Sequence, residues 1–333
     1  MHRSIGGIKA VAVLAWGLGI CLLSGCPSGS AQKSPRDKPV LVTTTGMVTD
    51  LVRHVVGDRA KVVGLYGAVD PHLYAPTASD MIQIKEADVV FYSGLHLEGP
   101  MGTAFEARRR RDGKLFAVTD HLPADQVRTP EGSTGHPDPH VWHDPILWGE
   151  CGLYVAEVMA EANPEHAAEY RENAKNYAEE LKQLDAFARE VLGAIPESRR
   201  QLVTAHDAFE YFAARYGLEV RSIQGISTES QAGLYDVNRI VDLLVERKIP
   251  RIFIESTVND KYIGQVIKGA ESRGWHVEKG DVLYSDAMGN PGTYEGTYIG
   301  MLDHNIAAIA SGLGAEWTGP VSYRESQEQS AEK

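Results

Sequence analysis

Two runs of alternating strand-like and helix-like segments, separated by a stretch without strand signals, constrain the fold of this chain most strongly. In the first run, short β-branched segments lie at residues 40–45, 61–66, 88–93 and 114–119. In the second run, comparable segments lie at residues 201–205, 219–223, 251–256 and 275–279. Strands that alternate with helices favour parallel sheets covered by helices on both faces. We therefore predict an α/β fold of two lobes, each with a parallel sheet of roughly four strands.

The stretch between the two runs, residues 145–196, is rich in Ala, Glu, Lys and Leu and predicts helices. Asn163 and Pro164 are typical of a helix start, with Asn as N-cap and Pro at the first helical position. No Gly or Pro follows before Leu192, which predicts a helix of roughly 45 Å at about 1.5 Å per residue. We expect this long helix to join the two lobes rigidly and to limit their hinge motion.

The N-terminus has the pattern of an export signal. Residues 1–25 combine Arg3 and Lys9 with an apolar run that is too short to span a bilayer comfortably. The run ends in LSGC at residues 23–26, which resembles the lipobox of bacterial lipoproteins, in which the cysteine is acylated. We predict a signal peptide, a lipid anchor on Cys26, and a location outside the cytoplasm on a membrane. A plain secretory signal with a chance cysteine is the alternative.

The remaining boundaries follow from composition. Residues 26–38 are polar and rich in Ser and Pro, as expected of a flexible tether. The predicted N-terminal lobe occupies residues 39–144, and the C-terminal lobe occupies residues 197–314. The last stretch, residues 315–333, has few apolar side chains and predicts a flexible tail.

Charge and cysteine usage narrow the partners and the stabilising chemistry. A net charge of −12 argues against a nucleic-acid partner, because such binding depends on Lys and Arg neutralising phosphates. Cys21 leaves with the predicted signal and Cys26 carries the predicted lipid, so Cys151 has no disulfide partner. We expect Cys151 to be a small buried side chain on a helix. Without a disulfide, the fold must be stabilised by packing or by a metal.

Histidines cluster in GHPDPHVWHDP at residues 135–145, but not with the spacing of a helical metal site. His136 and His140 stand four residues apart, as two ligands on one helical face would. A residue before proline is pushed out of the α region, so Pro137 and Pro139 require an extended or turned backbone. We therefore expect one or two ligands at most from this stretch and the others from elsewhere.

Metal-competent side chains follow predicted strands in both halves of the chain. Ligands of open α/β sheets bind at the carboxyl ends of the strands. At these positions the first half has His72 and His140, and the second half has His206 and Asp286. His72 and His140 both stand in Asp-Pro-His, where proline restricts the backbone just before the ligand. Three imidazoles and a carboxylate suit a Zn²⁺ or Mn²⁺ site. The alternative for each residue is a loop side chain that hydrogen-bonds to the backbone.

Several stretches together resemble the metal-specific solute-binding lipoproteins of ABC importers, the TroA/ZnuA-like group. They extend over most of residues 39–312. The matching stretches are DPHLYAPTASD from residue 70, GLHLE from residue 94, DPHVW from residue 138, TAHDAFEYF from residue 204, FIEST from residue 253, SDAMG from residue 285 and GTYEGTYIGMLDHN from residue 292.

This resemblance implies two α/β lobes joined by one long helix, with a metal ion held between them. The family's ligands fall on His72, His140, His206 and Asp286. The implied function is the extracytoplasmic capture of Zn²⁺ or Mn²⁺, one ion per monomeric chain, and its delivery to an ABC permease. Zinc-specialised members often carry a long His-rich loop, whereas residues 121–139 contain few histidines. Manganese-specialised members often have Glu where His206 stands, so the choice between Zn²⁺ and Mn²⁺ stays open.

Other polar residues near these stretches have two interpretations each. Glu255 either holds an imidazole N–H or is buried and paired elsewhere. His96 lies at a strand end and is a candidate for orienting a ligand. His136 and His143 are expected to contact solvent or to support ligands, and Asp207 is expected to cap the helix that it opens.

A zinc-dependent hydrolase and a surface adhesin are the competing functions. A hydrolase needs an open metal position for water and a general base, and the sequence has neither HExxH nor G-x-S-x-G. Four protein ligands nearly close the metal's coordination shell, which suits capture and not catalysis. Some members of the family are linked to surface attachment, but no feature of this sequence encodes adhesion. We therefore predict a transport component that is not an enzyme.

Overall fold

The computed structural model describes residues 38–130 and 136–331. The predicted signal peptide, the predicted lipid site Cys26 and the predicted tether up to residue 37 lie outside the described residues. Within the part of the chain that is described, no helix combines the length and the apolar character that a membrane crossing requires.

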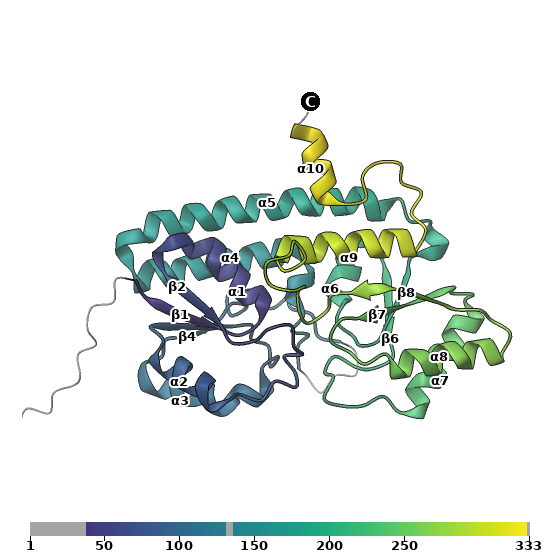
Figure 1. The fold of residues 1–333 in the computed structure, drawn as a ribbon, viewed down its shortest axis with the longest axis horizontal. Helices are drawn as coiled ribbons and strands as arrows, with labels where there is room; N and C mark the ends of the chain where they lie inside the picture. The colour runs from purple at the N-terminus through teal and green to yellow at the C-terminus, as the bar shows by residue number, and fades with distance from the viewer. Residues whose placement is uncertain (1–37, 131–135, 332–333) are drawn as a thin grey trace, which may run out of the picture. The chain divides into compact units, whose positions relative to one another are not determined.

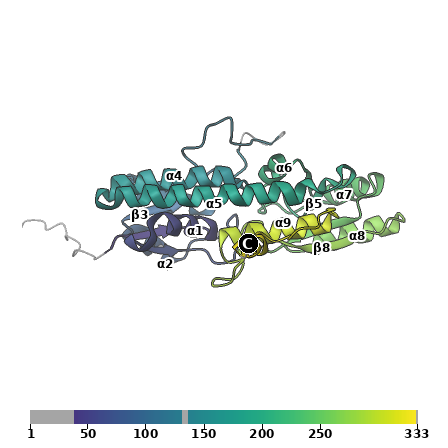
Figure 2. The same cartoon turned by 90° about the horizontal axis from the view of Figure 1, so that it is seen from above.

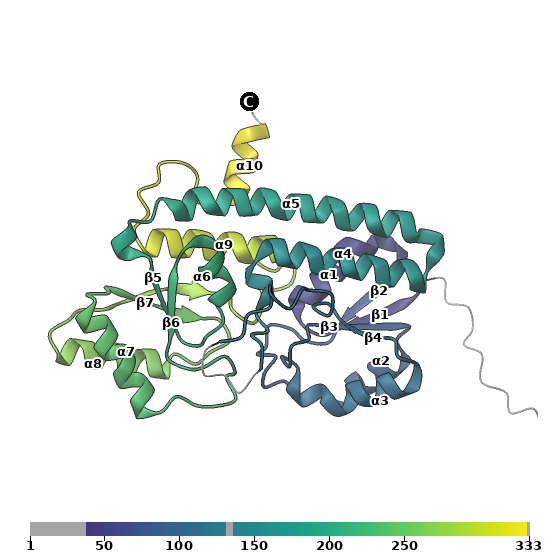
Figure 3. The same cartoon turned by 180° about the vertical axis from the view of Figure 1, so that it is seen from behind.

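The N-terminal lobe contains one parallel sheet of four strands in the order β2-β1-β3-β4. Each of the four strands overlaps a segment predicted from the sequence, so this sheet is confirmed. Leu41 and Phe91 point to one face of the sheet, and Val42 and Val90 point to the other, where α2 and α3 lie (Figure 3). The elements of this lobe are β1 (Val40–Thr43), α1 (Gly46–Val56), β2 (Lys61–Gly64), α2 (Ala78–Glu86), β3 (Val89–Tyr92), α3 (Gly102–Asp112) and β4 (Leu115–Ala117).

The C-terminal lobe contains four strands in two parallel pairs, β5-β6 and β7-β8, and β5 lies beside β7. The α/β fold class with parallel strands in both lobes is therefore confirmed. The elements of this lobe are β5 (Gln201–Thr204), α6 (Glu210–Tyr216), β6 (Glu219–Ser222), α7 (Leu234–Glu246), β7 (Arg251–Glu255), α8 (Lys261–Ser272), β8 (Glu278–Leu283) and α9 (Tyr298–Gly312).

The last strand lies further along the chain than predicted. The prediction placed it at residues 275–279, whereas β8 covers Glu278–Leu283. Trp275 and Val277 instead pack into an apolar cluster, and Trp275 Nε1 donates a hydrogen bond to the Ile249 carbonyl at 2.7 Å. Their apolar character therefore reflects packing before the strand and not strand pairing.

Two helices occupy the stretch between the lobes, as predicted. They are α4 (Pro145–Ala162) and α5 (Ala167–Gly193), which lie side by side (Figure 2). The 27 residues of α5 give it a length of about 40 Å. Its start differs from the prediction, because a 3₁₀ turn precedes α5 and the Asn163 side chain donates to Tyr170 Oη instead of capping the helix.

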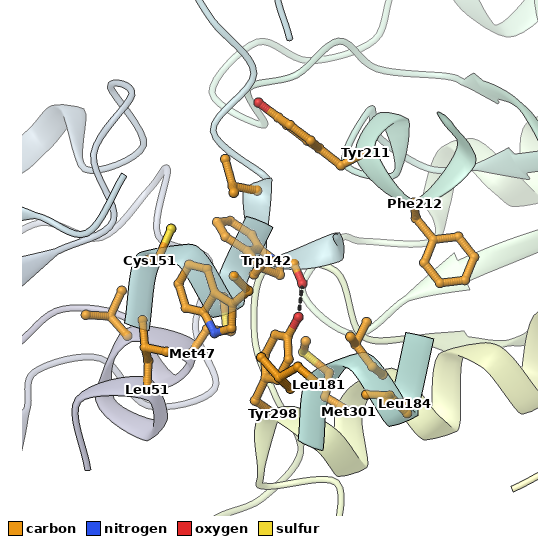
Figure 4. Packing of buried hydrophobic residues seen from close by; sticks show 14 of the residues in the cluster. Met47, Leu51, Trp142, Cys151, Leu181, Leu184, Tyr211, Phe212, Tyr298 and Met301 are labelled. Carbon is orange, nitrogen blue, oxygen red and sulfur yellow. Dashed lines mark hydrogen bonds between the residues drawn. The ribbon is translucent and has the colours of Figure 1, made fainter. Parts of the chain in front are cut away.

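The long helix contacts both lobes. It packs against α1 of the N-terminal lobe and against α6 and α9 of the C-terminal lobe (Figure 1). A single cluster of buried side chains joins these helices and includes Leu51, Cys151, Leu181, Tyr298 and Met301 (Figure 4). Cys151 is 1% exposed on α4, which confirms the prediction for this residue. This shared core supports the predicted rigid connection.

The segment predicted as a flexible tail contains a further helix, α10 (Tyr323–Ala331). Tyr323 is buried at its start. The carboxylate of Asp303, on α9, accepts hydrogen bonds from Ser322 Oγ and from the backbone N–H groups of Tyr323 and Arg324. One buried carboxylate thus anchors the beginning of α10 to α9.

Candidate metal site

The four residues predicted as ligands lie together between the lobes. His72 follows β2, His140 precedes α4, His206 follows β5 and Asp286 follows β8. One nitrogen or oxygen atom from each residue lies within 4.8 Å of the others, and all four side chains are buried. His72 Nε2 and His140 Nε2 are 3.4 Å apart, and Asp286 lies 3.3 Å from His140 Nε2 and 3.1 Å from His206 Nε2. Two residues from each half therefore converge on one small volume.

The Asp286 carboxylate is buried at the centre of this group. Neither of its oxygens, nor His206 Nε2, has a partner with hydrogen-bond geometry among the described residues. Burial alone would raise the pKa of Asp286, but His206 and His140 hold it well below its usual range. A buried ionised carboxylate requires a positive charge nearby. A bound cation would supply that charge.

The three imidazoles differ in their protonation. Burial lowers the pKa of His72 to about 3, so this ring is neutral. Burial also opposes the charged form of His140, but Asp138 and Asp286 outweigh it and raise the pKa to about 9. The pKa of His206 is raised well above its ordinary value because Asp286 and Glu255 outweigh burial. Without a metal, protons on these two rings therefore supply the positive charge.

Asp138 orients His140. Its Oδ1 accepts hydrogen bonds from the backbone N–H of His140 at 2.9 Å and from His140 Nδ1 at 2.7 Å. The Asp70 carboxylate makes the same backbone contact with the N–H of His72 at 2.9 Å. In both Asp-Pro-His turns the aspartate thus fixes the turn beside proline. No role for these two aspartates was predicted from the sequence. The signal was available, because an aspartate stands two residues before each histidine.

Glu255 orients His206. This buried residue at the end of β7 accepts a hydrogen bond from the backbone N–H of His206 at 2.8 Å and another from His206 Nδ1. With Nδ1 held in this way, the ring directs Nε2 toward Asp286. Of the two interpretations of Glu255, contact with an imidazole N–H is the one that these hydrogen bonds match.

Trp142 connects the two halves of the site. Its Nε1 donates to the carbonyl of Ser285, the residue before Asp286, at 2.8 Å. Tyr298 Oη donates to the Trp142 carbonyl at 2.7 Å (Figure 4). The segment after His140 and the segment before Asp286 therefore belong to one hydrogen-bonded unit in the shared core.

Three polar residues near the site differ from their predicted surroundings. His143 is fully buried against Phe209, with ring centroids 4.5 Å apart, and neither of its nitrogens has a hydrogen-bond partner among the described residues. His96 is exposed, and its ring packs edge-on against His136 and not against one of the four grouped residues. Asp207 does not cap a helix, because α6 begins at Glu210 and Phe209 occupies the N-cap position. The predicted cap was wrong.

These features define a two-lobed protein in which, among the described residues, one buried group of side chains between the lobes could hold a cation. A family described as "Zinc-uptake complex component A periplasmic" matches residues 41–312. The chain belongs to this family, whose members are the substrate-binding components of metal importers.

Individual relatives carry the names of different metals. The manganese-binding lipoprotein MntA of Bacillus subtilis is 43% identical over 292 residues, which are 87% of this chain and 95% of MntA. The zinc-binding protein TroA of Treponema pallidum is 40% identical over 86% of this chain and 92% of TroA. A solved structure of TroA from the same organism matches with a TM-score of 0.79 and 40% identity, over 83% of this chain and 99% of that chain. Membership of the family therefore does not select one metal.

Proposed function

We propose that this chain captures one divalent transition-metal ion through His72, His140, His206 and Asp286 and delivers it to an ABC permease. The observation that carries the proposal is the convergence of these four buried groups, three imidazoles and one carboxylate, on one small volume. The names of the relatives, which include manganese-binding and zinc-binding proteins, support the same class of cargo.

The donor set suits zinc and tolerates manganese. Imidazole nitrogen and carboxylate oxygen both bind Zn²⁺, whereas Mn²⁺ prefers oxygen donors. Affinity at a given site follows the Irving–Williams order, in which Zn²⁺ stands above Mn²⁺. We expect Zn²⁺ to bind more tightly than Mn²⁺ in solution, whichever metal the cell delivers.

Capture without catalysis follows from the surroundings of the proposed ligands. A catalytic zinc ion keeps a position open for water and needs a general base beside it. Here four protein groups lie within 4.8 Å of one another. Asp138 and Glu255, the carboxylates that contact the proposed ligand imidazoles, already accept hydrogen bonds from them. The energy for transport would come from the ATPase of the importer.

The domain organisation and the anchor belong to the same proposal. Lobes at residues 39–144 and 197–314 would close on the ion, and the helices of residues 145–196 would limit their movement. A signal peptide at residues 1–25 and a lipid on Cys26 would hold the monomeric chain at a membrane outside the cytoplasm. Relatives described as lipoproteins support this location.

Thermal unfolding of the purified chain tests the proposal. Metal at a thousandfold above Kd should stabilise the fold by about 4 kcal/mol, so removal by a chelator should lower Tm and zinc should restore it. The His140→Ala variant should lose this response together with its bound metal. The His276→Ala variant, which changes an exposed imidazole outside the group, should keep both. A Tm that does not respond to verified removal of the metal would refute the proposal.

A further inference from the structure

A cavity of about 510 Å³ leads from the protein surface to His72. Both lobes contribute to its walls. The N-terminal lobe supplies the loop of His96 and the segment of His136, and the C-terminal lobe supplies Asp207 and residues 225–227 with Glu229. Because His72 is only 4% exposed, this cavity is its route to solvent. An ion that reaches the proposed ligands by this route passes the side chains of the wall.

Two histidines that the proposed capture site does not use contact each other in this wall. His96 and His136 are exposed, and their ring centroids are 4.9 Å apart at an interplanar angle of 81°. The ring pairs of the buried group have centroid distances of 5.4 to 6.2 Å and interplanar angles of 60 to 86°. The outer rings thus lie 0.5 Å closer together than the closest pair of the buried group, and their interplanar angle falls within the same range.

The backbone that presents His96 is unusual. Leu95 and His96 have φ angles of 51° and 69°, a left-handed conformation that residues other than glycine rarely adopt. The buried Glu98 holds the turn by accepting hydrogen bonds from the backbone N–H groups of Ser93 and Gly94. Leu97 is buried while His96 is exposed in the cavity wall. Strain of this kind is costly and concentrates at functional positions.

The C-terminal lobe adds two carboxylates to the cavity wall. Asp207 and Glu229 line the same cavity from the opposite lobe. Glu229 Oε1 lies 4.0 Å from the position that a Cβ on Gly99 would occupy, which places this carboxylate against the His96 loop. Carboxylates in a cleft with low-dielectric walls attract cations and speed their association.

We propose that His96 and His136 form an outer site at the mouth of the cavity, which binds a divalent transition-metal ion weakly before the ion passes to His72. Imidazole nitrogen selects transition metals over Ca²⁺ and Mg²⁺, so the outer site would also filter the cations that reach the interior. This proposal rests on the proposed function, because it assigns the outer site a role on the path to the inner one.

Stopped-flow mixing with Zn²⁺ tests the kinetic role. Trp142 lies 5.2 Å from the His140 ring, centroid to centroid, and provides an intrinsic fluorescence signal for filling of the inner site. In the His96→Ala, His136→Ala double variant, the association and dissociation rate constants should fall together, by severalfold, because a site on the path serves both directions. The matched control is His276→Ala, which should associate with Zn²⁺ at the rate of the unmodified chain.

Equilibrium titration with Zn²⁺ tests the site itself. A chain with His140→Ala and Asp286→Ala should lose its tight ion and keep one weak ion, and adding His96→Ala with His136→Ala should remove the weak ion. An association rate unchanged in the double variant, or no weak ion in the chain without the inner site, would overturn the outer site. Loss of tight binding in the unmodified chain would instead contradict the proposed function, so the two failures are distinguishable.

Discussion

Thr228 donates a hydrogen bond from Oγ1 to Asp70 Oδ2 at 2.6 Å and so connects the two lobes beside the candidate metal site. The other oxygen of Asp70 accepts the backbone N–H of His72 at 2.9 Å. One carboxylate therefore contacts both the opposite lobe and the turn that carries a proposed ligand. Opening the lobes would break the first contact and release one constraint on the second.

The Thr228→Val variant should release metal faster. Valine keeps the shape of threonine but removes the hydroxyl, and a hydrogen bond to a charged group contributes about 1.5 to 3 kcal/mol. We expect the dissociation rate of Zn²⁺ to rise about tenfold, which corresponds to about 1.4 kcal/mol. Stopped-flow chelator chase measures this rate. Thr103→Val is the matched control, because Thr103 is exposed on α3 and does not line the cavity. Equal rates in both variants would remove the lobe-closing role of Thr228.

The Glu255→Gln variant should bind zinc more weakly while it keeps one ion per chain. The two carboxylate oxygens of Glu255 accept one hydrogen bond each, from the backbone N–H and from Nδ1 of His206. Glutamine has one acceptor oxygen and one donor NH₂ group, so it can replace only one of these two acceptors. Loss of a carboxylate behind a ligand imidazole reduces metal affinity by about 10- to 100-fold. Competition with a chromophoric chelator measures the change. Glu278→Gln, which alters an exposed partner of Arg251, should leave the affinity as it is. An unaltered affinity in Glu255→Gln would show that His206 needs no support.

Zinc binding at neutral pH should release about two protons, one each from His140 and His206, because the raised pKa values of both rings keep them protonated without metal. His72 is already neutral at this pH, since burial lowers its pKa to about 3. Affinity should therefore rise as pH increases from 6 and continue to rise toward pH 9, beyond the ordinary imidazole pKa of about 6.5. Calorimetry at pH 7 in buffers of different ionisation enthalpy counts the protons. A binding enthalpy independent of the buffer would contradict this protonation of the site.

The positions of the four grouped residues follow from local signals in the sequence. Runs such as VLVT of β1 are β-branched and buried on both faces, so their ends could be located within a few residues. The residues that follow those ends are then candidates for a site, and the recurrence of Asp-Pro-His favours His140 over its neighbours. The weakest strand prediction was β8, whose sequence EKGDVL has no β-branched run.

Glu255 was a candidate for holding an imidazole N–H, but the sequence did not indicate which histidine it contacts, and the contact of Trp142 could not be predicted. Glu255 lies 49 residues from His206, and the carbonyl bonded by Trp142 lies 143 residues away in Ser285. Such contacts depend on how the elements pack in three dimensions and leave no periodic trace in the chain. For Asp207 a local signal predicted a role that the fold does not use. Its side chain suits a helix N-cap, but the residue lies in a bend three residues before α6.

The Gly300→Ala variant should be strongly destabilised and should also bind metal poorly. A Cβ on Gly300, in the first turn of α9, would lie 1.8 Å from the Tyr294 carbonyl oxygen, so the backbone of the preceding loop would have to move. Overpacking of this severity costs at least about 2 kcal/mol. The loop continues from Asp286 and is closed by the Gly289 N–H, which donates to the Glu295 carbonyl at 2.7 Å, so its displacement would disturb the site. In Gly264→Ala the new methyl meets open space within α8, and a gain of about 0.4 to 1 kcal/mol is expected. Urea unfolding in the presence of chelator compares the two variants without the contribution of metal. Equal midpoints would contradict the close approach of the loop to α9.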